Sequence, residues 1–244
     1  YGSNTIGSNL APHMASEYLK NLGAKSVVKI DGEKENESSL QAYIPRLDKV
    51  MGIQIHAHGS STAFEGFKQN NIDIGMSSRA IKDEEKMSLL VKHGDLTLAK
   101  NEVVIAMDGL SVITHPQNQL KKITTKQLAE IFSGKISNWS YFGLTDKPIT
   151  VYARDDKSGT YDTFNSLVLK PFNFTLTTNA KRFESNNQLS EEVQQDSGAI
   201  GFTGMAYVNQ NNVLNIGVSP EFDYIAPTNF SVNTEEYPLA RRLY

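Results

Sequence analysis

The chain has 244 residues, of which 39% are hydrophobic and 21% are charged, and its formal net charge at pH 7 is −3. This length allows one large domain or two lobes with a sizeable core, and the composition is typical of a soluble globular protein. No basic stripe is present, which argues against a nucleic-acid-binding protein and means that any anion site must be local. The absence of cysteine excludes disulfide and zinc–sulfur chemistry, and no apolar run approaches the length of a membrane span.

Hydrophobic periodicity predicts helices that alternate with strands along the chain. The expected helices, in chain order, are 10–19, 64–72, 83–91, 124–131, 158–170 and 185–193. The expected strands are 27–30, 40–44, 53–57, 73–76, 103–107, 111–114, 148–152, 198–202 and 213–218. This alternation predicts an α/β protein with mostly parallel sheets. Ligands of such proteins bind at the carboxyl ends of strands, where helices begin.

The stretch from Tyr152 to Phe164 has the residues of an oxyanion site. The strand expected at 148–152 is followed by a turn from Arg154 to Gly159, and a helix is expected to begin at Ser158, Gly159 and Thr160. The free N–H groups of a helix start, the two hydroxyls and the guanidinium fork of Arg154 are all donors that suit a tetrahedral anion. Taken alone, the same residues fit an ordinary helix cap and a surface arginine about equally well.

The same arrangement of small and hydroxyl residues at a strand end occurs in three further loops. These are Gly2–Gly7, Gly59–Thr62 and Ser77–Arg79. Each loop by itself is best explained as a cap or a turn. Four such loops together favour convergence on one small anion, which would receive about ten hydrogen bonds worth ~1.5–3 kcal/mol each.

The motifs of these loops resemble those of the phosphate-binding-protein family, the substrate-binding components of phosphate ABC transporters. They are especially similar to a subgroup sometimes fused to an OmpA-like domain. The resemblance implies a two-lobed type II periplasmic-binding-protein fold with a ligand cleft between the lobes. We expect lobe 1 to comprise residues 1–107 and 215–244, and lobe 2 residues 108–214, with a hinge at Asp108-Gly109. The motifs occur in family order and are Ile55–Thr62, Ile74–Arg79, Tyr152–Asp162 and Gly198–Phe202.

The resemblance also implies which residues contact phosphate. Lobe 1 would contribute Thr5, the N–H of Ile6 and Ser60, with Ser61 in support. Lobe 2 would contribute Arg154, Ser158, Gly159 and Thr160, and Asp156 matches the acidic residue that pairs with and orients the arginine of this motif.

One position departs from the family pattern. Ser78 stands where well-known transport members have an aspartate that accepts the proton of phosphate. A serine hydroxyl donates or accepts, so it rejects fully ionised sulfate only weakly. Arg79, the next residue, is expected either to add positive charge at the site or to close the Ser77 turn.

The histidines do not predict a metal site. His56 and His58 alternate on one strand, but two ligands make a poor site and no acidic or cysteine partner has matching spacing. They are therefore interpreted as partly exposed strand residues. No catalytic residue, metal or cofactor is predicted, because neither a nucleophile–base pair nor a metal cluster is visible.

The function expected from the sequence is non-enzymatic capture of inorganic phosphate, or a similar oxyanion, for uptake, scavenging or sensing. The expected location is the periplasm or envelope of a bacterium, after export. The expected partners are an ABC permease or a fused envelope-anchoring domain. The alternative is an envelope adhesion or interaction module that retains the fold and uses its surface.

Overall fold

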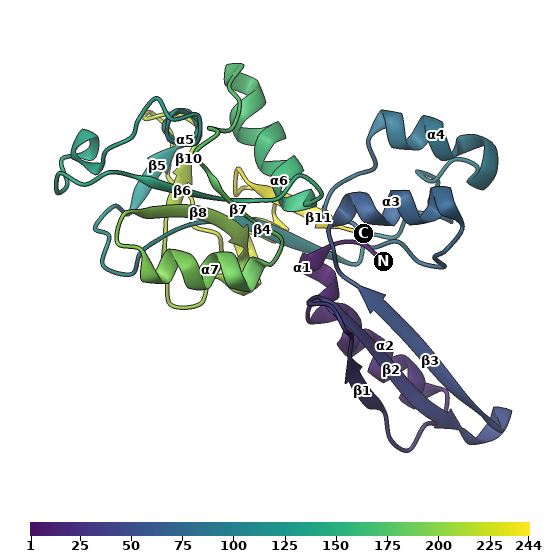
Figure 1. Cartoon of the computed structure of the whole chain (residues 1–244). Coiled ribbons are helices and arrows are strands. Elements are labelled where there is room, and N and C mark those ends of the chain that lie inside the picture. The colour runs from purple at the N-terminus through teal and green to yellow at the C-terminus, as the bar shows by residue number, and fades with distance from the viewer. The chain divides into compact units, whose positions relative to one another are not determined.

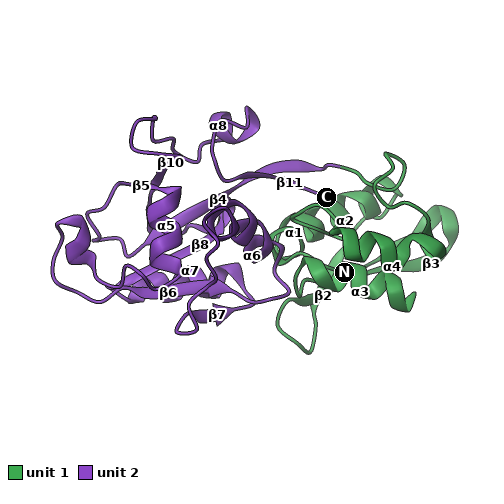
Figure 2. Ribbon diagram, turned by 90° about the horizontal axis from the view of Figure 1, so that it is seen from above, with its two compact units in different colours: residues 1–103, 244 green, residues 104–243 purple.

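The structure is a computed structural model that describes all 244 residues, and it divides into two compact units (Figure 2). Unit 1 comprises residues 1–103 together with Tyr244, and unit 2 comprises residues 104–243. Residues 215–243, expected in the first lobe, lie in unit 2. The reason is strand pairing, since β10 (Asn215–Gly217) pairs with β5 (Lys122–Thr124), and β11 (Ala240–Leu243) pairs with β4 (Ala106–Thr114).

Unit 1 contains an antiparallel sheet of three strands, β1 (Val28–Asp31), β2 (Glu37–Ile44) and β3 (Lys49–His56). A 3₁₀ turn at Pro45–Leu47 joins β2 to β3. On β2, Leu40, Ala42 and Ile44 are buried and alternate with exposed residues, so one face of the sheet is apolar. Helix α2 (Leu10–Asn21) packs against β2 and β3 (Figure 1).

The remainder of unit 1 begins with the single helical turn α1 (Asn4–Gly7) and includes α3 (Ser60–Gln69) and α4 (Asp83–His93). The prediction of a buried strand at 73–76 is wrong. This segment forms only an isolated bridge between Gly2 and Met76, and Ile74 is exposed. Its backbone is instead bonded to the first residues of the chain, with Met76 N–H donating to Tyr1 O at 2.8 Å.

Unit 2 is built on a six-stranded mixed sheet. Its path is β11-β4-β8-β6-β7, with β9 paired to β4. The pairs β6–β7 and β6–β8 are parallel, whereas β4 is antiparallel to β8, β9 and β11. The prediction of mostly parallel sheets is therefore wrong. The strands not yet defined are β6 (Thr150–Arg154), β7 (Lys181–Phe183), β8 (Ala199–Gly204) and β9 (Asn212–Val213).

Helices cover both faces of this sheet (Figure 1). On one face α5 (Thr125–Phe132) and α6 (Gly159–Phe164) pack into the larger core, where the rings of Phe164 and Phe202 stack at 4.0 Å. On the other face α7 (Asn186–Gln195) packs against a smaller cluster that includes Ile113 and Tyr152. The remaining helical segments are Trp139–Phe142, Asn165–Leu169, Lys170–Phe172, Met205–Tyr207 and α8 (Asn229–Asn233).

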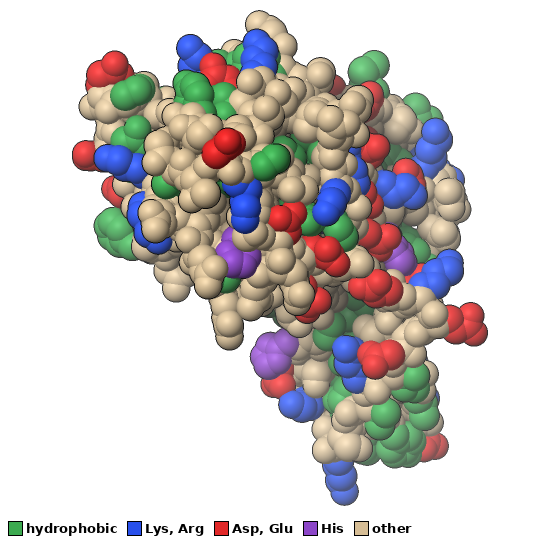
Figure 3. All heavy atoms as spheres, turned by 60° about the vertical axis from the view of Figure 1, so that its left-hand side comes forward, with side chains coloured by type: hydrophobic (Ala, Val, Ile, Leu, Met, Phe, Trp, Pro, Cys, Tyr) green, Lys and Arg blue, Asp and Glu red, His purple; other side chains and the backbone are tan.

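Strand β4 runs without interruption through Asp108 and Gly109, the expected hinge. The two apolar segments predicted on either side of these residues are thus one strand preceded by irregular chain. Charges of both signs are interspersed on the face drawn in Figure 3, in keeping with the small net charge. None of the helices combines the length and the apolar character that crossing a bilayer requires.

Candidate functional site

Arg154 is the largest fully buried side chain of the protein, with 1% of its surface exposed. It is the last residue of β6, and all three guanidinium nitrogens donate to acceptors within unit 2. Nε donates to Phe183 O at 3.2 Å, Nη1 donates to the Asn186 side-chain oxygen, and Nη2 donates to Glu184 O. Three neutral acceptors thus fix the plane of the guanidinium, and two of its five N–H groups remain for a further acceptor.

The charge of this guanidinium has no carboxylate among its hydrogen-bond partners. Burial lowers the pKa of Arg154 to about 10, an effect that the nearby Asp155 partly opposes. The side chain is therefore still cationic at neutral pH. A buried cation with only neutral partners is costly unless an anion completes its surroundings, so this position is suited to an anionic ligand.

The prediction that Asp156 pairs with Arg154 is wrong. The Asp156 side chain is 86% exposed, and its Oδ1 accepts from Arg182 Nη2 at 2.6 Å. The acids that interact electrostatically with Arg154 are Asp155, the next residue in the chain, and to a lesser extent Glu184. Burial raises the pKa of the Asp155 carboxyl, and Arg154 opposes that rise. Asp156 lies beyond the end of β6 in an exposed turn, where its carboxylate is paired with Arg182 and not with the buried guanidinium.

Ser158, Gly159 and Thr160 begin α6, as predicted, and all three are buried. Ser158 is the N-cap and its Oγ accepts from Tyr161 N–H at 3.3 Å. A hydroxyl that accepts in this way still has its own proton to donate. The helix start therefore combines hydroxyl donors with the backbone N–H groups of the first turn, close in sequence to Arg154.

A second buried arginine belongs to this group, and no sequence pattern indicated it. Arg241, on β11, is 6% exposed, and its Nη1 donates to Thr160 Oγ1 at 2.8 Å. Its Nε and Nη2 donate to Asp108 Oδ2 at 2.9 and 2.6 Å. Asp108 thus neutralises Arg241, while Arg241 fixes the Thr160 hydroxyl. The guanidinium of Arg241 is also close enough to that of Arg154 for its positive charge to lower the pKa of Arg154.

In unit 1 the structure brings together two of the predicted residues, Ser60 and Ser78. Their hydroxyl oxygens are 3.2 Å apart, and Ser78 N–H donates to Ser60 Oγ at 3.0 Å. Both side chains are buried, with 0% and 1% exposed. Ser60 is the first residue of α3, whose N-cap is Gly59 at φ +112° and has no side chain to bond the first N–H groups. These groups are suited to receive an anion.

Arg79 holds this region together through an ion pair. Its Nη1 and Nη2 donate to the two carboxylate oxygens of Glu85 at 2.8 and 2.6 Å, and Nη2 also donates to Ser61 Oγ at 3.1 Å. The guanidinium lies 5.1 Å from the centre of the Phe64 ring. Because Glu85 balances the charge of Arg79, this arrangement favours a structural role for Arg79 over the alternative of adding positive charge at the anion site.

The first loop is tied to the same region. Gly2 N–H donates to His56 O, and Gly59 N–H donates to Gly2 O, both at 2.8 Å. Thr5 and Ile6 follow in α1 and are 8% and 1% exposed. The loop before α1 and the loop before α3 are thereby neighbours in unit 1. Their contacts with an anion stay a prediction.

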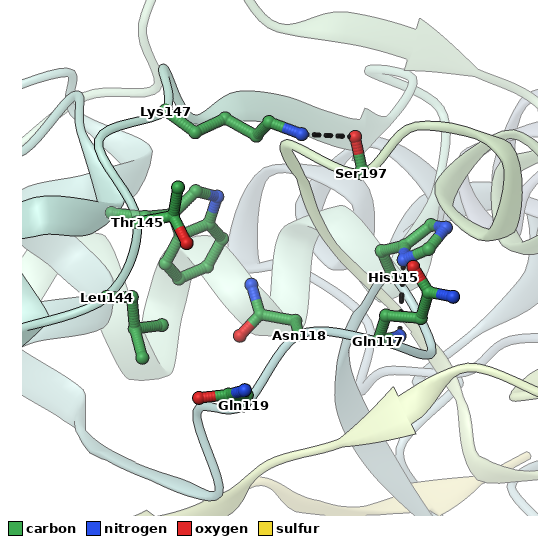
Figure 4. Close-up of a pocket in the computed structure, with 9 residues that line it drawn as sticks. His115, Gln117, Asn118, Gln119, Leu144, Thr145, Lys147 and Ser197 are labelled. Atoms are coloured by element: carbon green, nitrogen blue, oxygen red, sulfur yellow. Dashed lines mark hydrogen bonds between the residues drawn. The ribbon is translucent and has the colours of Figure 1, made fainter.

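A separate pocket in unit 2 lies away from the predicted residues (Figure 4). Its one cationic lining group, Lys147, donates to Ser197 Oγ, and most of the remaining side chains are neutral amides or hydroxyls. It therefore has a single lysine and no arginine with which to hold an oxyanion. The lining residues are His115, Gln117, Asn118, Gln119, Trp139, Leu144, Thr145, Lys147 and Ser197.

Comparison with known proteins identifies the family of the chain. The family model of the PBP superfamily domain matches residues 19–244. The chain belongs to the PBP superfamily. The predictions of a periplasmic-binding-protein fold and of kinship with phosphate-binding proteins are confirmed.

Among relatives of this superfamily member, the Phosphate-binding protein PstS of Borreliella burgdorferi is 27% identical over 92% of this chain and 79% of its own length. Protein SphX of Synechococcus elongatus is 34% identical over 67% of this chain, which spans about half (49%) of that relative. A crystal structure described as a phosphate ABC transporter substrate-binding protein from Clostridium perfringens, with bound phosphate, has a TM-score of 0.74. It is 27% identical and covers 99% of this chain and 82% of its own.

Proposed function

We propose that this PBP superfamily member captures inorganic phosphate, or an oxyanion of the same shape, and performs no chemistry on it. The donors are Arg154, Ser158, Gly159 and Thr160 of unit 2 and Thr5, Ile6, Ser60 and Ser78 of unit 1. Ser61 and Arg79 support the unit 1 donors. The relatives named for phosphate binding, one of them in complex with phosphate, support this choice of ligand.

The observation that carries the proposal is the environment of Arg154. Its buried guanidinium is held in one plane by neutral acceptors and has N–H groups left to donate. An oxyanion would satisfy those donors and the positive charge together. Hydroxyl and N–H donors at the start of α6 are the expected complement of such a guanidinium.

Selectivity between phosphate and sulfate should be modest. Ser78 bonds Ser60 through both its N–H and its hydroxyl, and the residue at this position is a serine where an aspartate would demand a protonated ligand oxygen. Because a hydroxyl can donate to either anion, we expect the preference for phosphate over sulfate to be weaker than a carboxylate at this position would give.

We further propose that the chain acts outside the cytoplasmic membrane of a bacterium, in the periplasm or bound to the envelope. Its role there would be to deliver phosphate to an ABC permease or, as part of an envelope-anchored protein, to scavenge or sense it. Kinship with substrate-binding proteins of phosphate transport supports this location and this partner.

The test is isothermal titration calorimetry with phosphate on the wild-type chain and on Arg154→Ala. Loss of a desolvated charge contact should weaken binding by at least about 2 kcal/mol, roughly 30-fold. Arg154→Lys, which keeps the charge but not the planar fork, should give an intermediate affinity and guards against misfolding of the alanine variant. Arg182→Ala removes a partly exposed cation nearby and is the control. Unchanged affinity in both Arg154 variants would overturn the assignment.

A further inference from the structure

Three side chains in unit 1, outside the proposed anion donors, converge on one point. Glu37 Oε1 lies 3.1 Å from His56 Nδ1 and 2.9 Å from His58 Nε2. The three atoms all lie within 4.8 Å of one another. From these distances we infer that Glu37, His56 and His58 form a binding site for a single divalent transition-metal ion, for which Zn²⁺ is the best match.

The distances are close to those of a zinc site. Two ligand atoms at about 2.0–2.1 Å from Zn²⁺ in a tetrahedral arrangement are separated by ~3.4 Å. The two separations from Glu37 Oε1 are 3.1 and 2.9 Å, so each histidine nitrogen needs to move only a few tenths of an ångström from that oxygen to admit an ion, and the two nitrogens themselves lie within 4.8 Å of each other. Two imidazoles and a carboxylate are a donor set that zinc accepts, with water in the fourth position.

The backbone holds these ligands in place. Glu37 on β2 and His56 on β3 are register partners across the sheet, so their side chains are on the same face. His58 follows His56 by two residues. The strand end is fixed by two hydrogen bonds, from Gly2 N–H to His56 O at 2.8 Å and from Ala57 N–H to Asn36 O at 2.9 Å.

The orientation of one ligand ring is fixed as well. The Tyr1 ring stacks on the His56 imidazole, with 4.1 Å between ring centres and 12° between planes. Such support reduces the rotamer freedom that metal binding would otherwise have to remove. The side chains of Glu37, His56 and His58 are 17, 21 and 25% exposed, so solvent and ions reach them.

The chemistry of the donors selects the class of ion. Imidazole nitrogen suits zinc, copper, iron and nickel, whereas magnesium and calcium prefer oxygen ligands.

Equilibrium dialysis of the full chain against Zn²⁺, in phosphate-free buffer, tests the site. The wild-type chain should retain one Zn²⁺ per molecule, and Glu37→Gln and His58→Gln should each weaken binding at least tenfold. His115→Gln, which removes a histidine of unit 2, should bind as the wild type does. Far-ultraviolet circular dichroism of each variant checks that the fold is retained.

Co²⁺ supplies a second readout, because inner-sphere imidazole coordination changes its visible absorption and that change should vanish in His58→Gln. No retained Zn²⁺ in the wild type, or equal affinity in both site variants, would show that the three side chains form a hydrogen-bonded cluster only and would overturn the inference. Phosphate calorimetry is independent of this result, so failure of the metal site leaves the proposed phosphate function untouched.

Discussion

Replacing Asp108 by asparagine should destabilise unit 2 severely. Its Oδ2 accepts two N–H groups of Arg241, and the two side chains are only 7 and 3% exposed. Asparagine keeps an acceptor oxygen but removes the charge, which leaves a buried guanidinium uncompensated. Breaking a buried pair in this way costs about 3–5 kcal/mol, a large fraction of the ~5–15 kcal/mol that stabilises a typical domain. Because an acceptor remains, we expect the lower end, about 3 kcal/mol.

Urea denaturation followed by tryptophan fluorescence measures this loss in unit 2. Trp139 is the only tryptophan of the chain, is 2% exposed and donates its Nε1–H to Gly198 O at 3.0 Å. Glu235→Gln is the matched control, because it breaks an ion pair with Arg242, the residue after Arg241 on β11. Both side chains of this control pair are 55% exposed. That control should cost less than about 1 kcal/mol. Equal losses in Asp108→Asn and Glu235→Gln would refute the reasoning.

Three further predictions concern Arg154, Ser60 and the isolated bridge that joins Gly2 to Met76. Because burial lowers the pKa of Arg154 to about 10, the guanidinium stays charged from pH 8 to 9, and phosphate affinity should change little over that range. The affinity should then fall as the pH rises through about 10. Calorimetry that shows a complete loss of binding already at pH 9 would contradict this. Ser60→Ala should weaken phosphate binding roughly tenfold, since it removes one donor to a charged ligand, with unchanged circular dichroism. Gly2→Ala should destabilise unit 1 by more than ~2 kcal/mol, because a Cβ there would lie 2.0 Å from Met76 O. Hydrogen exchange of the β2 and β3 amides should become faster in this variant. In the control Gly52→Ala, where the nearest atom to the new Cβ is 3.7 Å away, exchange should be unchanged.

Elements whose signals are local could be predicted from the sequence. The helix predicted at 124–131 is α5, which begins at Thr125, and the hydroxyl of its N-cap Thr124 accepts from Gln127 N–H at 3.2 Å. The helix start at Ser158 was likewise predicted, because both the residue types and the preceding apolar strand are contiguous in the chain. Within unit 1, the proximity of Ser60 and Ser78 agrees with the prediction that their two loops converge, although the segment before Ser77 is not a strand.

Features that depend on distant pairing could not be predicted in the same way. Arg241 is 133 positions from Asp108, and nothing in its local sequence indicates that β11 pairs with β4. Segment 73–76 has the apolar character of a buried strand, but it is joined only to the first residues of the chain and forms a single bridge, with Gly2, so Ile74 remains exposed. The acid near Arg154 was misassigned by one residue, since a turn after a strand gives no period from which side-chain direction can be predicted.

The histidine cluster shows the same limit. His56 and His58 are visible as an alternating pair, but Glu37 lies 21 positions before His58 and outside the strand predicted at 40–44. Register between β2 and β3 brings the carboxylate opposite His56. A third ligand contributed by a neighbouring strand is therefore apparent only when the strands are paired.

The most direct test of the central claim is a crystal structure of the wild-type chain grown with arsenate, a heavier anion of the same shape, with diffraction recorded at the arsenic absorption edge. We expect one anomalous peak per chain, with arsenate oxygens about 2.7–3.2 Å from the Arg154 guanidinium nitrogens and from the Ser60 and Ser158 hydroxyls. A peak that contacts neither Arg154 nor Ser60, or no peak at a concentration that saturates calorimetric binding, would contradict the proposed phosphate site.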